Sequence, residues 1–91
     1  MSNIKSQASY TLEVPVEFEG REVVELTFRR IKGKDIKAMD RHNGTDVDKA
    51  FFMIARLSGM APEFVDEMDG ADFEACSKII ENFMGRPGRR A

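Results

Sequence analysis

Residues 10–29 read YTLEVPVEFEGREVVELTFR, and they contain two runs in which apolar and polar residues alternate. A period of two is typical of a β-strand with one buried and one exposed face. Glu19 and Gly20 separate the two runs, so this stretch predicts an antiparallel β-hairpin. Because a two-stranded hairpin alone is marginally stable in water, further elements must cover its apolar face.

Parity predicts the register of this hairpin, because the two apolar sets must share one face of the sheet. A two-residue loop would place them on opposite faces. We therefore expect a three-residue loop, residues 18–20, with Gly20 in the left-handed region of a bulge. The expected pairs are Val14 with Val24, Leu12 with Leu26, and Tyr10 with Phe28.

The rest of the chain contains residues that typically begin and end helices. Residues 34–42 predict a short first helix, which stops at an Asn-Gly pair. Thr45 or Asp46 can cap a second helix that runs to about residue 58 and ends at Gly59. Pro62 suits the first turn of a short third helix.

The last helix is expected to begin at Asp69 and run to about residue 84. Asp72 stands three residues after Asp69, so the two resemble a capping box with Asp in place of Glu. Cys76 falls on the apolar face of this helix and is expected in the core. The predicted fold class is thus α+β, an N-terminal two-stranded antiparallel hairpin followed by three to four helices.

The 91 residues suffice for one domain, which we place at residues 10–84. Residues 1–9 are expected to form a flexible leader and residues 85–91 a flexible basic tail. A single cysteine cannot close an intramolecular disulfide, and no apolar run predicts a membrane span or a signal peptide. These features indicate a protein of the cytoplasm, without membrane partners.

Charge is segregated along the chain, although the net charge is only −2. Six acidic residues and no basic one fall within residues 63–74. A nucleic-acid partner is not expected from the net charge, but one basic region could bind nucleic acid. This basic strip consists of Arg29, Arg30, Lys32, Lys34, Lys37 and Arg41.

Catalytic and metal sites find no support in the sequence. One His and one Cys cannot supply the four ligands of a structural zinc site. No nucleophile lies in a motif that would pair it with His42, and no acid–base constellation is present. We therefore expect a protein that is not an enzyme and needs no cofactor.

Phe52 is the least ordinary residue of the second helix. On a helical wheel it falls among Asp48, Lys49 and Arg56, on the polar side. Either the hairpin and neighbouring helices cover this ring, or another chain does, a like subunit or a different protein. Six methionines also exceed the usual count for this length, and flexible thioethers suit both core gaps and adaptable binding surfaces.

Several motifs, taken in order, resemble the small tail assembly chaperones of long-tailed bacteriophages. The resemblance spans about residues 10–84. The motifs are LEVPV at residues 12–16, VELTFRR at 24–30, IARLSGM at 54–60 and MDGADF at 68–73, followed by Phe83.

This resemblance implies a role without catalysis in the cytoplasm of the bacterial host. Such a chaperone holds the tape measure protein until tail tube protein polymerises around it, and is absent from the mature virion. The alternative is a small nucleic-acid-binding or regulatory domain that uses the basic strip. Exposed apolar anchors would bind the partner, and the candidates are Phe52, Met53, Met60, Phe64 and Met68.

Overall fold

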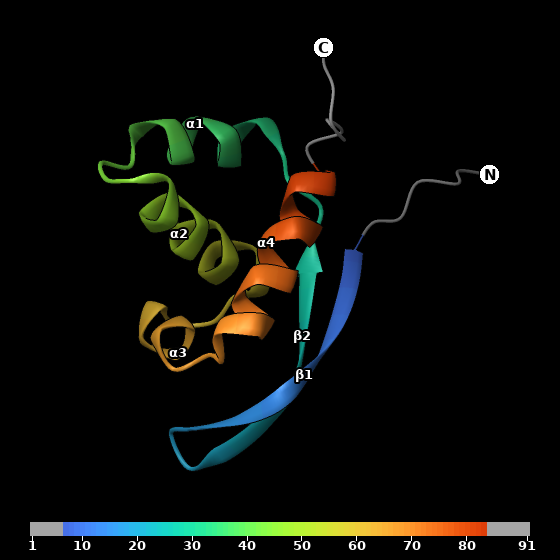
Figure 1. Cartoon of the computed structure of the whole chain (residues 1–91). Coiled ribbons are helices and arrows are strands. Elements are labelled where there is room, and N and C mark those ends of the chain that lie inside the picture. The colour runs from blue at the N-terminus through green and yellow to red at the C-terminus, as the bar shows by residue number, and fades with distance from the viewer. Residues whose placement is uncertain (1–6, 84–91) are drawn as a thin grey trace, which may run out of the picture.

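A two-stranded antiparallel hairpin lies against a layer of helices, and the tip of the hairpin projects beyond them (Figure 1). The computed structural model describes residues 7–83. The expected α+β class is confirmed. The elements are β1 (Gln7–Phe18), β2 (Arg21–Arg29), α1 (Gly33–Arg41), α2 (Asp46–Ser58), α3 (Pro62–Asp66) and α4 (Gly70–Phe83).

The helix ends follow the capping signals. Thr45 caps α2, since its hydroxyl accepts a hydrogen bond from the backbone N–H of Asp48 at 3.2 Å. Gly59 ends the helix in the left-handed region, with φ of 75°. The strand β1 begins at Gln7 rather than at Tyr10. Residues 1–6 of the expected leader and all of the expected tail lie outside the described residues.

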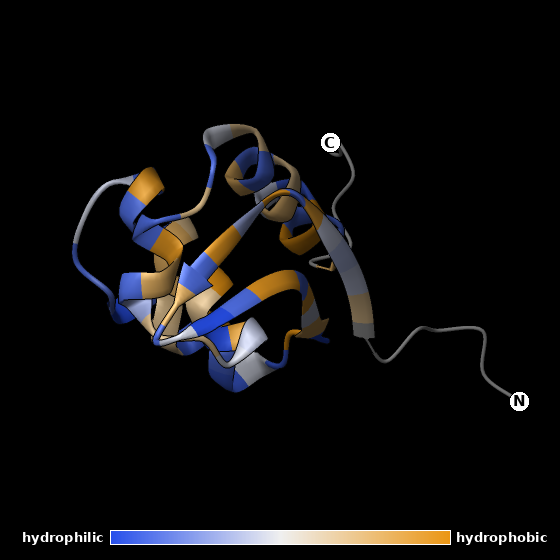
Figure 2. Ribbon diagram, turned by 90° about the horizontal axis from the view of Figure 1, so that it is seen from below, coloured by the Kyte–Doolittle hydropathy of each residue, from blue (hydrophilic) through white to orange (hydrophobic). Residues whose placement is uncertain are grey.

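The core fills the space between the hairpin and the helices. Both strands carry hydrophobic residues interspersed with hydrophilic ones (Figure 2). The helix α2 packs against β2, and α4 packs against β1. Cys76 is buried, as expected. Of the phenylalanines, Phe28 and Phe64 are fully buried, and those at 18, 51, 52, 73 and 83 are partly buried against the core.

The predicted hairpin register is wrong in both halves. Phe18 pairs with Arg21, so the loop is the two-residue Glu19-Gly20, with φ of 52° and 81°. These positive values match the turn that suits tight hairpins. Beyond the turn the ladder breaks, and residues 12–15 lie opposite Val24 alone.

This large bulge explains why the register predicted from parity is wrong. It inserts three extra residues into β1, an odd number, so the two halves of the ladder have opposite parity. Leu26 consequently pairs with Tyr10, and Phe28 with Ala8. Val14 and Val24, expected to face each other in the core, are each 48% exposed.

Asp72 satisfies the backbone that the bulge leaves unpaired. Its carboxylate, fully buried, accepts hydrogen bonds from the N–H groups of Glu13 and Val14 at 3.0 and 3.1 Å. The Tyr10 hydroxyl donates a third bond at 2.7 Å. The expected capping box is therefore wrong in its second half. Asp69 caps α4 through the N–H of Ala71, whereas Asp72 fastens α4 to the hairpin.

These hydrogen bonds also determine the ionisation of the Asp72 carboxyl group. Burial alone would raise the pKa of Asp72, but the hydrogen bonds from Tyr10, Glu13 and Val14 outweigh it and hold the pKa below its usual value. The same carboxylate raises the pKa of Tyr10 to about 12, chiefly through their hydrogen bond. Asp72 is thus a carboxylate that the fold requires in its charged form.

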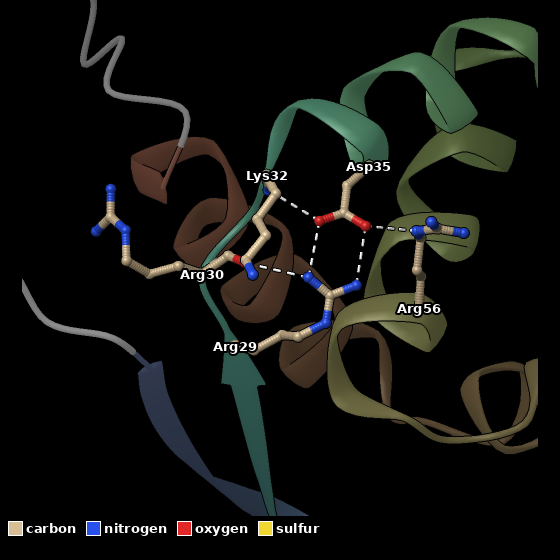
Figure 3. Close-up of polar contacts among 5 residues, drawn as sticks. All are labelled: Arg29, Arg30, Lys32, Asp35 and Arg56. Atoms are coloured by element: carbon tan, nitrogen blue, oxygen red, sulfur yellow. Dashed lines mark hydrogen bonds and ion pairs between the residues drawn. The ribbon is translucent and has the colours of Figure 1, made fainter.

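A second buried carboxylate, Asp35, joins β2, α1 and α2 (Figure 3). Arg29 donates to both of its oxygens, at 2.7 and 2.8 Å. Arg56 donates through Nε at 2.6 Å, and the backbone N–H of Lys32 at 2.8 Å. The Arg29 guanidinium holds the pKa of Asp35 well below its usual range against the opposing effect of burial, and Arg56 and Lys32 add to this.

We predict that Asp72→Asn lowers the free energy of unfolding by about 1–3 kcal/mol, because one amide cannot accept all three hydrogen bonds and turns its own N–H toward donors. Urea unfolding measures the loss. Asp69→Asn is the matched control, since Asn caps a helix as well as Asp, and it should change stability by less than about 0.5 kcal/mol. Equal effects of the two substitutions would contradict the role given to Asp72.

The two buried carboxylates also predict a dependence of stability on pH. Their folded pKa values lie below the unfolded ones, so the stabilisation is present at neutral pH. It should disappear as the pH falls below about 4 and through the folded pKa values. Urea unfolding over a pH series tests this, and Asp35→Asn should flatten the acid limb. A stability that stays constant into strong acid would refute it.

Candidate partner-binding surface

Phe52 lies partly buried on α2, with its ring stacked on His42. The ring centroids are 4.6 Å apart and the planes differ by 17°. The guanidinium carbon of Arg56 lies 5.8 Å from the centre of the Phe52 ring. These contacts hold at the surface an aromatic ring that the helical wheel places on the polar side of α2.

A short connection between α1 and α2 brings His42 to this position. His42 ends α1 in an extended conformation, with its N–H donated to the carbonyl of Met39 at 3.1 Å. Gly44 follows with φ of 138°. A Cβ at this position would overlap the Asp48 side chain, so the tight turn requires glycine.

A groove of about 310 Å³ opens beside the Phe52 ring, between the end of α1, the first half of α2, and α3. We call it the aromatic groove. Its walls are apolar where two phenylalanines and a proline line it, and two carboxylates add negative charge. The lining residues are His42, Asp48, Phe51, Phe52, Pro62 and Asp66.

The two carboxylates of the aromatic groove differ in their surroundings. Asp48 accepts hydrogen bonds from the N–H and hydroxyl of Thr45, at 2.9 and 3.2 Å, and these lower its pKa. Asp66 is exposed on α3, which also carries the exposed Glu63. The lining of the groove therefore contains two carboxylates, one on α2 and one on α3, beside His42.

A second groove, of about 330 Å³, lies between α1, α2 and α4. We call it the methionine groove. Ser77 lines it, and the Ser77 hydroxyl is buried with no hydrogen-bond partner among the described residues. The other lining residues are Met39, Asp46, Lys49, Ala50, Met53, Ile80 and Glu81.

The structure separates the five predicted anchors. Phe52 lines the aromatic groove. Met60 is partly buried and lines a shallow hollow of about 290 Å³ beside β2. Met53 is 1% exposed and Phe64 0%, and Met68 is also buried. These three are core residues, which corrects their assignment as exposed anchors.

Packing explains the correction. Phe64 meets Phe18 edge to face, with ring centroids 5.6 Å apart, so the hairpin covers it. Met53 and Met68 belong to the same buried cluster, where flexible thioethers fill gaps. Of the two roles that the sequence left open for methionine, core packing applies to Met53 and Met68.

The basic strip is partly neutralised by the fold. The Arg29 guanidinium is bound to the buried Asp35. The guanidinium carbon of Arg30 lies 5.8 Å from the centre of the Phe83 ring. The remaining members are exposed: Lys32, Lys34, Lys37 and Arg41.

The described residues offer little material for catalysis. Burial, followed by the nearby charge of Asp72, raises the pKa of the Cys76 thiol to about 12, so the reactive thiolate is disfavoured. Within residues 7–83, no group of three His, Cys, Asp or Glu side chains could hold a metal ion. No helix in this part of the chain is long and apolar enough to cross a membrane.

Sequence reasoning missed Asp35, Asp72 and Arg56 as organising residues. Asp35 and Asp72 occupy the third position of α1 and α4, where an acidic residue is ordinary. Arg56 shares the polar side of α2 with Phe52. An aromatic ring on that side indicates that another part of the chain, or another chain, covers it. Neither signal identifies the distant partners, because Arg56 lies 21 residues from Asp35 and the partners of Asp72 lie 58–62 residues away.

Comparison with known proteins gives one family. A family model described as phage tail assembly chaperone proteins, E, or 41 or 14, matches residues 9–85. The match includes all four helices and nearly all of the hairpin. No curated protein and no solved structure matches the chain.

Proposed function

Since the chain belongs to the family of phage tail assembly chaperones, as its motifs predicted, we propose that it binds the tape measure protein while tail tube protein assembles around it. The family match over residues 9–85 carries this proposal. The role is one of binding, requires no catalytic chemistry, and is exercised in the cytoplasm of the bacterial host. The chaperone then leaves, so the mature virion lacks it.

The aromatic groove supports this proposal because it offers what a chaperone needs. Phe52 presents apolar surface, while Asp66 and the exposed residues of α3 keep the surroundings charged. An apolar ring at a hollow can become fully desolvated when a partner covers it, as residues that dominate binding energy are. The charged surroundings limit association of the free chaperone with itself.

The nucleic-acid alternative has less support. Arg29 of the basic strip is engaged by Asp35, and phosphate would meet net negative charge on the molecule as a whole. Elution from a heparin or DNA column at low salt is expected. Retention that depends steeply on salt would favour the alternative.

We predict that fragments of the tape measure protein are retained by the immobilised chain, and that Phe52→Asp weakens their binding about tenfold or more. The substitution removes the apolar wall and adds a charge to the groove. Because Phe52 is only partly buried, the variant should stay folded, at a cost of about 1–2 kcal/mol. Circular dichroism and thermal unfolding check this.

Val24→Asp is the matched control, because it makes the same chemical change at an exposed apolar residue of the hairpin. It should leave binding unchanged. A folded Phe52→Asp variant that binds as tightly as the wild type removes Phe52 from the interface. If no fragment binds the wild-type chain, or if mass spectrometry finds the chain as a stoichiometric part of mature virions, the proposed function is contradicted.

A further inference from the structure

The aromatic groove has features that specify the chemistry of its occupant. We propose that it receives one apolar side chain of a helical segment in which Lys or Arg residues flank that side chain on the same face. This inference rests on the proposed function, and it adds the site, the helical form and the charge pattern of the bound segment.

The apolar walls are held in place before any partner arrives. Phe52 is stacked on His42, and Phe51 is packed on Phe73 with ring centroids 4.6 Å apart. Pro62 forms a further part of the lining and has a restricted backbone. Because these rings lose little further freedom on binding, the groove is suited to act as an anchor site.

The size of the groove limits what can enter it. A volume of about 310 Å³ is near the lower end of the range for ligand sites, so it admits a side chain and not a second helix. The body of a bound helix must therefore lie across the mouth. Residues one turn before and after the inserted side chain then project along the rim.

The charge around the aromatic groove determines which residue types can occupy the positions one turn before and after the inserted side chain. Asp48 lies on α2 and Asp66 on α3, so the lining contributes carboxylates from two elements. Glu63 and Glu67, exposed on and just after α3, are outside the lining and add negative charge to the same helix region. The nearby cation Arg56 is already ion-paired with Asp35. Lysine or arginine on the bound segment would complement this rim, and an acidic residue would be repelled.

A pair of synthetic helical peptides tests the proposal. Both carry a central Leu, and they differ only in having Lys or Glu one turn before and after it. Fluorescence anisotropy with the full chain should show the Lys peptide binding about tenfold more tightly than the Glu peptide. Replacing the central Leu by Ser should abolish binding of the Lys peptide.

Asp66→Lys should weaken the Lys peptide about tenfold and strengthen the Glu peptide. Asp66 is exposed, so this variant is expected to keep the fold, which circular dichroism verifies. Glu22→Lys makes the same change of charge on the hairpin, where Glu22 faces Glu17. This control should alter neither affinity if the effect is local to the groove.

Equal affinities for the two peptides, or equal effects of Asp66→Lys and Glu22→Lys, would overturn the inference. Failure of the inference and of the proposed function can be told apart. If tape measure fragments bind the wild type and Asp66→Lys alike, the aromatic groove is not the site while the proposed function stands. If the Lys peptide binds as described but no tape measure fragment does, the proposed function fails and the chemistry of the groove remains.

Discussion

The buried carboxylate of Asp35 fixes the mutual positions of β2, α1 and α2. It accepts four hydrogen bonds, from Arg29, Arg56 and the backbone of Lys32, and it is fully shielded from solvent. A buried charge persists only with such partners, so the three elements cannot move apart without exposing or stranding it. The position of α1 in turn determines where His42 meets the Phe52 ring, and this contact forms one wall of the aromatic groove.

The buried carboxylates of Asp35 and Asp72 therefore stabilise different parts of this small domain. Asp35 organises the end of the hairpin and the first two helices, while Asp72 attaches α4 to the middle of β1. A chain of this size buries a small core, and charge-assisted hydrogen bonds add to its stability and specificity. Both groups act as carboxylates, so their protonation in acid weakens the fold, and the hydrogen bond from Tyr10 to Asp72 adds a dependence on alkaline pH.

Local signals predicted the elements well, because capping and alternation depend on neighbouring residues. Thr45, Gly59 and Pro62 mark helix ends as expected, and the hairpin forms where the alternation lies. Register was predicted wrongly because the bulge depends on Asp72, whose partners lie about 60 residues away in sequence, beyond the reach of any local pattern. The helical wheel identified Phe52 as unusual, yet composition alone could not distinguish surface methionines from core ones such as Met53.

Binding at the aromatic groove, rather than along the basic strip or the hairpin, would be visible residue by residue in solution. Titration of the ¹⁵N-labelled chain with a tape measure fragment, followed by amide chemical shifts, tests it most directly. We expect the largest shifts to cluster in residues 42–52 and 63–66, with little change on the hairpin tip. Shifts confined to β2 or to α1, with the amides around Phe52 and Asp66 unmoved, would contradict it.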